Sequence, residues 1–332
     1  MMPMLTPQGL QIGVVNINNK TIRIMKMNLN NPAFLQSASN VVGKPETRFV
    51  FVEGENSVQL SANGLVVIES VQDGEKVRET YSALNNTNVT INADAGTEVV
   101  IYGAVTKFRS FTTYPHNTIT SLDVSKNTAL TELSCQGCTD LTSLDVSKNT
   151  ALTKLDCGIC KGLTDLDVSK NTALDDLYCG SCTGLTDLDV SKNTALTRLD
   201  CGSCTGLTNL DVSKNTALTE LSCQGCTDLT SLDVSKNTAL TKLDCGDCQN
   251  LLMLNIKNTA ELNNGTILDK SMANLTTLQV AGASEWSYEQ VENWLNDFAP
   301  NDGTILVDEN TPQEVTTAAT AKNWTVEYVD AA

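Results

Sequence analysis

Between residues 119 and 251 the chain repeats itself every 22 residues, six times over. The repeats differ so little that residues 131–152 and 219–240 are the same string, TELSCQGCTDLTSLDVSKNTAL. Self-similarity at a fixed period of this length is typical of a solenoid, in which each coil contacts only its neighbours. The repeat therefore predicts the architecture of this region, and it favours recognition over catalysis as the role of the chain.

Each repeat consists of two half-coils of 11 residues. LTSLDVSKNTA at 141–151 is a Val half, LTKLDCGICKG at 152–162 is a Cys half, and both have apolar residues at positions one, four and six. The L-x-V and L-x-C steps alternate with period two, as in a short strand with one buried face. We therefore expect a strand in each half. Stacking the coils at about 4.8 Å would then give two parallel sheets on a flattened tube.

The patterns LxxLxCxxCxxL and LxxLxVxxNxxL resemble the leucine-rich repeat consensus. Their alternation resembles the nested bacterial subclass of that family, in which both halves of the unit obey the consensus. One departure is length, because that subclass usually has one residue fewer per unit. The resemblance implies a scaffold that binds a protein, peptide or glycan, often at a bacterial surface, with no shared chemistry and no cofactor.

Residues 1–118 follow a different pattern and predict an all-β, sandwich-like domain. Segments rich in Val, Ile and Thr alternate with turns such as Asn18-Asn19 and Asp73-Gly74. The last strands before Ile119 are expected to cap the solenoid, and the domain could also mediate oligomer formation. The expected strands cover residues 10–17, 21–27, 48–52, 64–71, 88–93 and 98–102.

After Leu251 the repeat degrades, and the pattern predicts a small α/β cap. Capping and periodicity signals place a helix at 287–299 and the start of another at Thr311-Pro312. A last half-coil and two strands are expected around 275–280, 304–307 and 324–329. The three tryptophans, all in this tail, are expected to cover the end of the core, with an aromatic binding site as the alternative: Trp286, Trp294 and Trp324. The resulting domains are 1–118, 119–262 and 263–332.

Twelve cysteines form six CxxC pairs, one in each Cys half: Cys135/Cys138, Cys157/Cys160, Cys179/Cys182, Cys201/Cys204, Cys223/Cys226 and Cys245/Cys248. Repeated CxxC can indicate zinc or an iron–sulfur cluster. However, the first cysteine occupies the inward slot of Val146 in the Val half, and the second occupies the slot of Asn149. Cysteine is a small, readily buried residue with a weak donor, so it suits both slots. We interpret the cysteines as core thiols, with disulfides or a metal at Cys135, Cys138, Cys157 and Cys160 as open alternatives.

One asparagine recurs in each Val half and is predicted to bridge backbone groups of successive turns that would otherwise be buried unpaired. The column contains Asn127, Asn149, Asn171, Asn193, Asn215, Asn237 and Asn258.

The outward positions of the Cys half vary, whereas those of the Val half, such as Asp145 and Lys148, hardly change. We interpret the constant face as solvated, with a calcium ladder as the alternative. The variable face is the candidate ligand-binding face. Its alternatives are drift on an unconstrained surface, or charge alternation that offsets repulsion between stacked side chains. One variable column contains Glu132, Lys154, Asp176, Arg198, Glu220 and Lys242, and its neighbour contains Ser134, Asp156, Tyr178, Asp200, Ser222 and Asp244.

The net charge of −17 argues against a nucleic-acid partner or an anionic membrane surface. Apolar runs fall short of the roughly 20 residues that a membrane-spanning helix needs. The first residues show no secretory signal, so a cytoplasmic or virion-associated protein is expected, or a cell-surface protein if the chain is a processed form. His116, the single histidine, belongs to no catalytic motif.

Two functions fit these observations, and neither is enzymatic. The first is a binding or adhesion scaffold for a protein or glycan, and the second is a structural part of a phage particle, with the solenoid as a rigid spacer.

Overall fold

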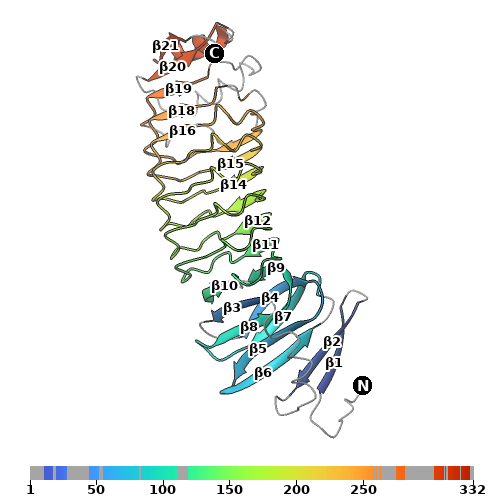
Figure 1. The fold of residues 1–332 in the computed structure, drawn as a ribbon. Helices are drawn as coiled ribbons and strands as arrows, with labels where there is room; N and C mark the ends of the chain where they lie inside the picture. The colour runs from blue at the N-terminus through green and yellow to red at the C-terminus, as the bar shows by residue number, and fades with distance from the viewer. Residues whose placement is uncertain are drawn as a thin grey trace. The chain divides into compact units, whose positions relative to one another are not determined.

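The fold is mainly β and divides into two compact units, residues 1–155 and 156–332 (Figure 1). It is taken from a computed structural model. The residues that it describes are 11–17, 20–27, 45–51, 55–81, 84–110, 119–257, 259, 262, 274–280, 303–309, 311, 313–321 and 323–329.

The first unit contains the sandwich-like β domain that the sequence predicts. One sheet has the order β1-β2-β6-β5-β8-β3-β10, and strands β9, β4 and β7 belong to a second sheet. The rings of Phe49 on β3 and Phe108 on β9 meet between the sheets, with centroids 5.5 Å apart. The strands are β1 (Gln11–Ile17), β2 (Lys20–Met27), β3 (Glu46–Phe51), β4 (Glu55–Ala62), β5 (Val66–Gln72), β6 (Glu75–Tyr81), β7 (Thr87–Asn92), β8 (Glu98–Tyr102), β9 (Val105–Ser110) and β10 (Ile119–Asp123).

Strands β4, β6 and β9 were not expected from the sequence. Strand β6 has the sequence EKVRETY, in which charged residues outnumber apolar ones. The alternation of apolar and polar residues that marks a strand is therefore weak here. The fold makes this composition acceptable, because Lys76 and Arg78 on β6 pair with Glu69 on the adjacent strand β5.

The first coil of the solenoid contacts this domain directly. Strand β11 (Glu132–Ser134) pairs in parallel with β9, so that Leu133 lies opposite Phe108. Asn127 is the first asparagine of the column, and its side-chain amide donates to Thr47 Oγ1 on β3 at 3.2 Å. The β domain therefore supplies both the strand and the hydrogen-bond acceptor that a preceding coil would supply.

In the second unit the Cys halves form a parallel sheet. Its strands β13 (Asp176–Tyr178), β14 (Arg198–Asp200), β15 (Glu220–Ser222) and β17 (Lys242–Asp244) pair in register, one repeat apart. The central leucine of each strand is buried in the core. Strand β12 (Lys154–Asp156) contains the boundary between the two units.

The sheet of the Val halves is shorter than expected. Residues 163–168, 185–190 and 207–212 contain no strand, although their Leu and Val side chains are buried. A second parallel sheet starts only at β16 (Ser231–Asp233), and continues through β18 (Met253–Asn255) and β19 (Thr277–Gln279). In the earlier coils the asparagine column ties the Val halves together. The amide Nδ2 of Asn215 donates to two carbonyls of the preceding coil, those of Val190 at 3.0 Å and Asn193 at 2.9 Å, and Asn149, Asn193 and Asn237 make the same pair of bonds.

The second cysteine of four Cys halves makes the matching contact: Cys182, Cys204, Cys226 and Cys248. Asn215 Nδ2 reaches a carbonyl 25 residues earlier, and Cys204 Sγ likewise donates to the carbonyl 25 residues earlier, that of Cys179, at 3.2 Å. An amide carries two donor hydrogens and a thiol carries one weak donor. The two residues thus fill equivalent slots, but cysteine provides only part of the bonding that asparagine provides.

The turn between the two cysteines of a pair forces one residue into the left-handed region of the backbone. This residue is Gly137 or Gly225 in the CQGC turns, but in the other coils it is a residue with a side chain. Ile159 is the most strained of them, with φ of 63°, because a β-branched residue rarely adopts this conformation.

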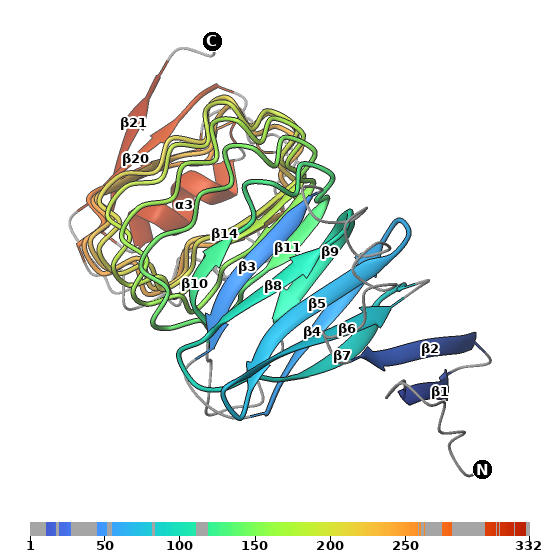
Figure 2. The ribbon, with the colours of Figure 1, turned by 60° about the horizontal axis from the view of Figure 1, so that its bottom comes forward.

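The end of the chain forms the α/β cap that the sequence predicts. Strands β20 (Thr304–Val307) and β21 (Thr325–Tyr328) extend the second sheet, and α3 (Gln313–Ala321) lies within the outline of the coils (Figure 2). Trp324 is buried, and its ring lies so close to Gly303 that a Cβ there would approach within 2.8 Å. The predicted helix at 287–299 lies outside the described residues, as do Trp286, Trp294, Asn258 and His116.

No helix in the described part of the chain is long and apolar enough to cross a membrane.

Candidate functional site

The candidate face is the outer surface of strands β13, β14, β15 and β17. Because each strand buries its central leucine, the residues before and after that leucine point outward in two columns. The parallel register aligns Asp176, Arg198, Glu220 and Lys242 in the first column, and Tyr178, Asp200, Ser222 and Asp244 in the second. The register therefore aligns the variable positions of successive repeats in two columns.

Charged side chains of the first column form ion pairs, either with each other or with a residue of the second column. The guanidinium of Arg198 makes a bidentate contact with Asp176 on the adjacent strand, at 2.7 and 3.0 Å. Asp176 is only 7% exposed, so it lies beneath this pair and is not the open surface residue that the sequence suggested. The hydrogen bonds to Asp176 raise the pKa of Arg198 above its ordinary value.

The same alternation of charge occurs in the first unit. Glu132 on β11 lies opposite Lys107 on β9 and pairs with it, and Arg109 Nη2 lies 3.6 Å from Glu132 Oε2. Opposite charges on neighbouring rungs stabilise a stacked column by removing the repulsion between like charges. Charge alternation, one of the alternatives to ligand binding, thus explains part of the pattern in this column.

Glu220 differs from the other acidic residues of the first column. It lies between Arg198 and Lys242 in the register, but Arg198 is paired with Asp176, and Lys242 Nζ contacts Asp244 Oδ2 on its own strand at 3.1 Å. Within the described part of the chain, the side chain of Glu220 makes no hydrogen bond or ion pair. Its carboxylate is exposed at the surface of the sheet.

Several members of the second column serve the turns. Asp156 Oδ1 accepts a hydrogen bond from the amide of Gly158 at 3.2 Å, and Asp200 Oδ1 accepts one from Gly202 at 2.9 Å. The aspartates of the constant face do the same, as Asp189 does for the amide of Ser191 at 2.8 Å. This role explains why aspartate recurs directly after the buried leucine in both halves of the repeat.

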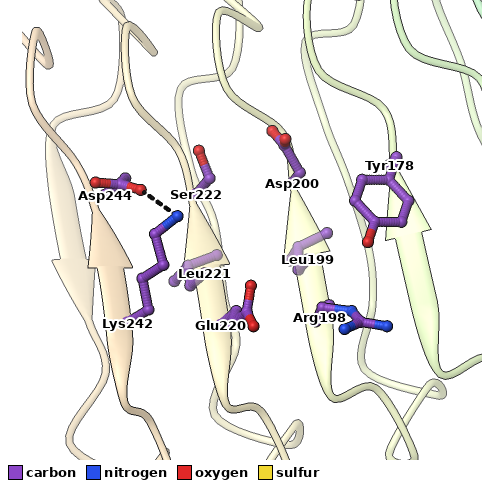
Figure 3. A pocket seen from close by; sticks show the side chains of 9 residues that line it. All are labelled: Tyr178, Arg198, Leu199, Asp200, Glu220, Leu221, Ser222, Lys242 and Asp244. Atoms are coloured by element: carbon purple, nitrogen blue, oxygen red, sulfur yellow. Dashed lines mark ion pairs between the residues drawn. The ribbon is translucent and has the colours of Figure 1, made fainter. Parts of the chain in front are cut away.

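A shallow depression of about 80 Å³ opens between the two columns (Figure 3). Tyr178 stands at one side of it, and Lys242 and Asp244 stand at the other (Figure 3). Leu199 and Leu221 also line it, although each is only 1% exposed because its side chain is buried in the core. The full lining is Tyr178, Arg198, Leu199, Asp200, Glu220, Leu221, Ser222, Lys242 and Asp244.

The depression brings together most of the candidate residues from the second unit, and leaves four candidates out. Glu132, Lys154, Asp156 and Asp176 do not line it. The two leucines were not among the candidates, because the repeat pattern marks them only as core residues.

The candidate metal ligands lie in the core. Cys135, Cys138, Cys157 and Cys160 are all buried, and the other eight cysteines are buried with them. The pKa of Cys179 is raised well above its ordinary value, mainly by its contact with the thiol of Cys204 and also by burial. A raised pKa disfavours the thiolate, which is the form that binds metals. Among the described residues, no three His, Cys, Asp or Glu side chains are grouped in a way that could hold a metal ion.

Comparison with known proteins gives limited similarity. No family model and no curated protein matches the chain. One similar solved structure is the functional domain of InlJ from Listeria monocytogenes, which includes a cysteine ladder, with 28% identity and a TM-score of 0.32. That match covers 57% of this chain, which spans about half (53%) of the InlJ structure.

A second similar structure is the internalin InlF from Listeria monocytogenes strain 4b F2365. It has 17% identity and a TM-score of 0.22, and the match covers 68% of this chain and 82% of that one. Both structures are of internalins, which are leucine-rich repeat proteins. Because both TM-scores are low, the description of this fold rests on the chain's own geometry: it is a mainly β protein whose repeats form a solenoid with parallel sheets.

Proposed function

We propose that the protein is a non-enzymatic binding scaffold that recognises a protein partner through the outer face of β13, β14, β15 and β17. The observation that carries this proposal is the depression on that face, which gathers side chains from four successive coils at positions where the repeats differ. The neighbouring core and turn positions of the same coils are nearly constant.

The chemistry of the depression suits a protein partner. Tyr178 and Arg198 are of the residue types that contribute most to protein interfaces. The ladder of backbone hydrogen bonds and the buried leucines hold these side chains on a rigid support, which limits the entropy lost on binding. A glycan partner stays a second possibility within the same proposal.

The test compares the intact protein with a double variant that alters the depression but no ion pair. Tyr178→Ser removes the aromatic ring, and Ser222→Gln fills the space between the columns. The matched control, Thr208→Ser with Asn209→Gln, changes exposed residues of a Val half. Each protein is immobilised and exposed to bacterial surface extracts, captured proteins are identified by mass spectrometry, and their dissociation constants are then measured with purified material.

We expect the double variant to weaken binding by about tenfold or more, as is typical of an aromatic anchor, and the control to bind like the parent. Equal binding by all three proteins would move the interaction away from this face. The alternative function, a structural part of a phage particle, has no support in the described residues and stays a prediction.

A further inference from the structure

The depression has an uneven distribution of charge. It contains two cationic side chains, those of Arg198 and Lys242, and both are already paired with carboxylates, Asp176 and Asp244. Two further carboxylates, Asp200 and Glu220, have no cationic partner of their own in the described part of the chain. Asp200 has one oxygen bonded to the amide of Gly202, and Glu220 has no side-chain bond.

Lys242 alone cannot neutralise these groups. Its pKa is raised first by the hydrogen bond to Asp244, and further by the charges of Glu220 and Asp200. The pKa of Arg198 is raised first by its hydrogen bonds to Asp176 and also by the charge of Glu220, so two cationic groups serve four carboxylates. The charges of the first column alternate in sign along the register, and Glu220 is the member of this alternation without an ion pair in the described part of the chain. A positive charge brought by another molecule would complete it.

The shape of the site favours the same kind of group. The ring of Tyr178 stands beside the depression on the side of Arg198 (Figure 3). An aromatic ring and carboxylates around a small space are a suitable environment for a guanidinium or ammonium group, which can contact the ring and bond to the carboxylates.

We infer that the depression between Tyr178 and Asp244 receives a cationic side chain from a basic segment of the protein partner, with Glu220 as its principal ion-pair acceptor. This inference rests on the proposed function, because it names the chemistry of the partner at the same face. The net charge of the chain, −17, would also favour the approach of a basic partner.

The probe is a fluorescein-labelled peptide, Gly-Ser-Gly-Arg-Gly-Arg-Gly-Ser-Gly, titrated with the full-length protein and followed by fluorescence anisotropy. Two further peptides of the same length replace arginine with citrulline, which is neutral and has nearly the same shape, or with glutamate. Glu220→Gln removes the charge of the proposed acceptor. Asp187→Asn, which changes the charge equally at an exposed position of a Val half, is the matched control.

We expect saturable binding of the arginine peptide, and affinity weaker by about threefold to tenfold for the citrulline peptide and for Glu220→Gln. Asp187→Asn should bind like the parent. If Glu220→Gln and Asp187→Asn weaken binding equally, the attraction is a general effect of charge and the site assignment is wrong. Equal or tighter binding of the citrulline or glutamate peptide, or no binding of any peptide, would overturn the cationic assignment.

Competition separates this inference from the proposed function. The arginine peptide should displace a captured partner from the intact protein. If the Tyr178→Ser, Ser222→Gln variant loses the partner but the arginine peptide fails to compete, the face binds its partner and the cationic side chain is not the group recognised there. If the partner is retained by that variant, the proposed function fails.

Discussion

At the scale of single residues, the equivalent positions of Asn215 and Cys204 differ in the number of hydrogen bonds that the side chain donates. Asn215 gives both amide hydrogens to carbonyls of the preceding coil, and Cys204 gives its single thiol hydrogen to one carbonyl. All of these groups are buried, so a carbonyl left without a donor cannot turn to water. The asparagine column should therefore contribute more to stability than the cysteine column.

Asn215→Ala is expected to lower the free energy of unfolding by about 2–4 kcal/mol, and Cys204→Ala by about 1–2 kcal/mol. Asn215→Cys should recover part of the loss, because a thiol can supply one of the two hydrogen bonds. Urea denaturation followed by circular dichroism measures all three variants. Similar losses for the two alanine variants would show that the hydrogen-bond count does not decide the difference.

At the scale of elements, strands β5 and β6 of the β domain are joined by partly buried ion pairs. Glu69 on β5 accepts hydrogen bonds from Arg78 at 2.7 Å and from Lys76 at 3.1 Å, both on β6. Burial alone would raise the pKa of Glu69, but these two hydrogen bonds outweigh it and lower the pKa below the ordinary value of 4.5. A carboxylate with a lowered pKa stabilises the folded state above its unfolded pKa, and this contribution is lost as the pH falls through the folded pKa.

The urea midpoint of the protein should therefore fall as the pH is lowered from about 5 to about 3, and the fall should be smaller in Glu69→Gln. Glu75→Gln, which removes a charge at an exposed position of β6, is the control and should behave like the parent. If the Glu69 variant follows the parent over this range, other carboxylates dominate the acid sensitivity.

At the scale of the whole molecule, the solenoid should shield its thiols from reagents. All twelve cysteines are buried, and contact with the thiol of the next coil, together with burial, raises the pKa of Cys157, Cys179, Cys201 and Cys223. Alkylation needs both access and the thiolate. Burial prevents access to all twelve thiols, and the raised pKa also disfavours the thiolate at these four.

Iodoacetamide at about pH 8, near the ordinary pKa of cysteine, should thus modify none of the twelve cysteines of the native protein within minutes. In denaturant without reductant it should modify all twelve, as counted by intact mass spectrometry. A lower count in denaturant would reveal disulfides, and a metal released on unfolding would revive the metal interpretation. Rapid labelling of the native protein would contradict the burial of the cysteines.

The sequence by itself determined the solenoid, its inward residues and the equivalence of the Asn and Cys slots. These follow from a period of 22 residues and from the alternation of apolar positions, and each copy repeats the same local evidence. It also located the outward columns, because a strand that buries Leu199 must expose Arg198 and Asp200. The turn hydrogen bond of Asp200 was within reach of the sequence too, since aspartate two residues before a turn amide is a known local motif.

The tertiary structure alone decided which charges pair, where a depression opens and how far the second sheet extends. Lys242 can reach Glu220 on the next strand or Asp244 on its own, and only the packed side chains select Asp244. The same holds for the Val halves, where nearly identical sequences form a strand at Ser231–Asp233 but not at 207–212. The physical reason is that inter-coil hydrogen bonds and ion pairs depend on the neighbouring coil, and a local pattern does not specify that neighbour.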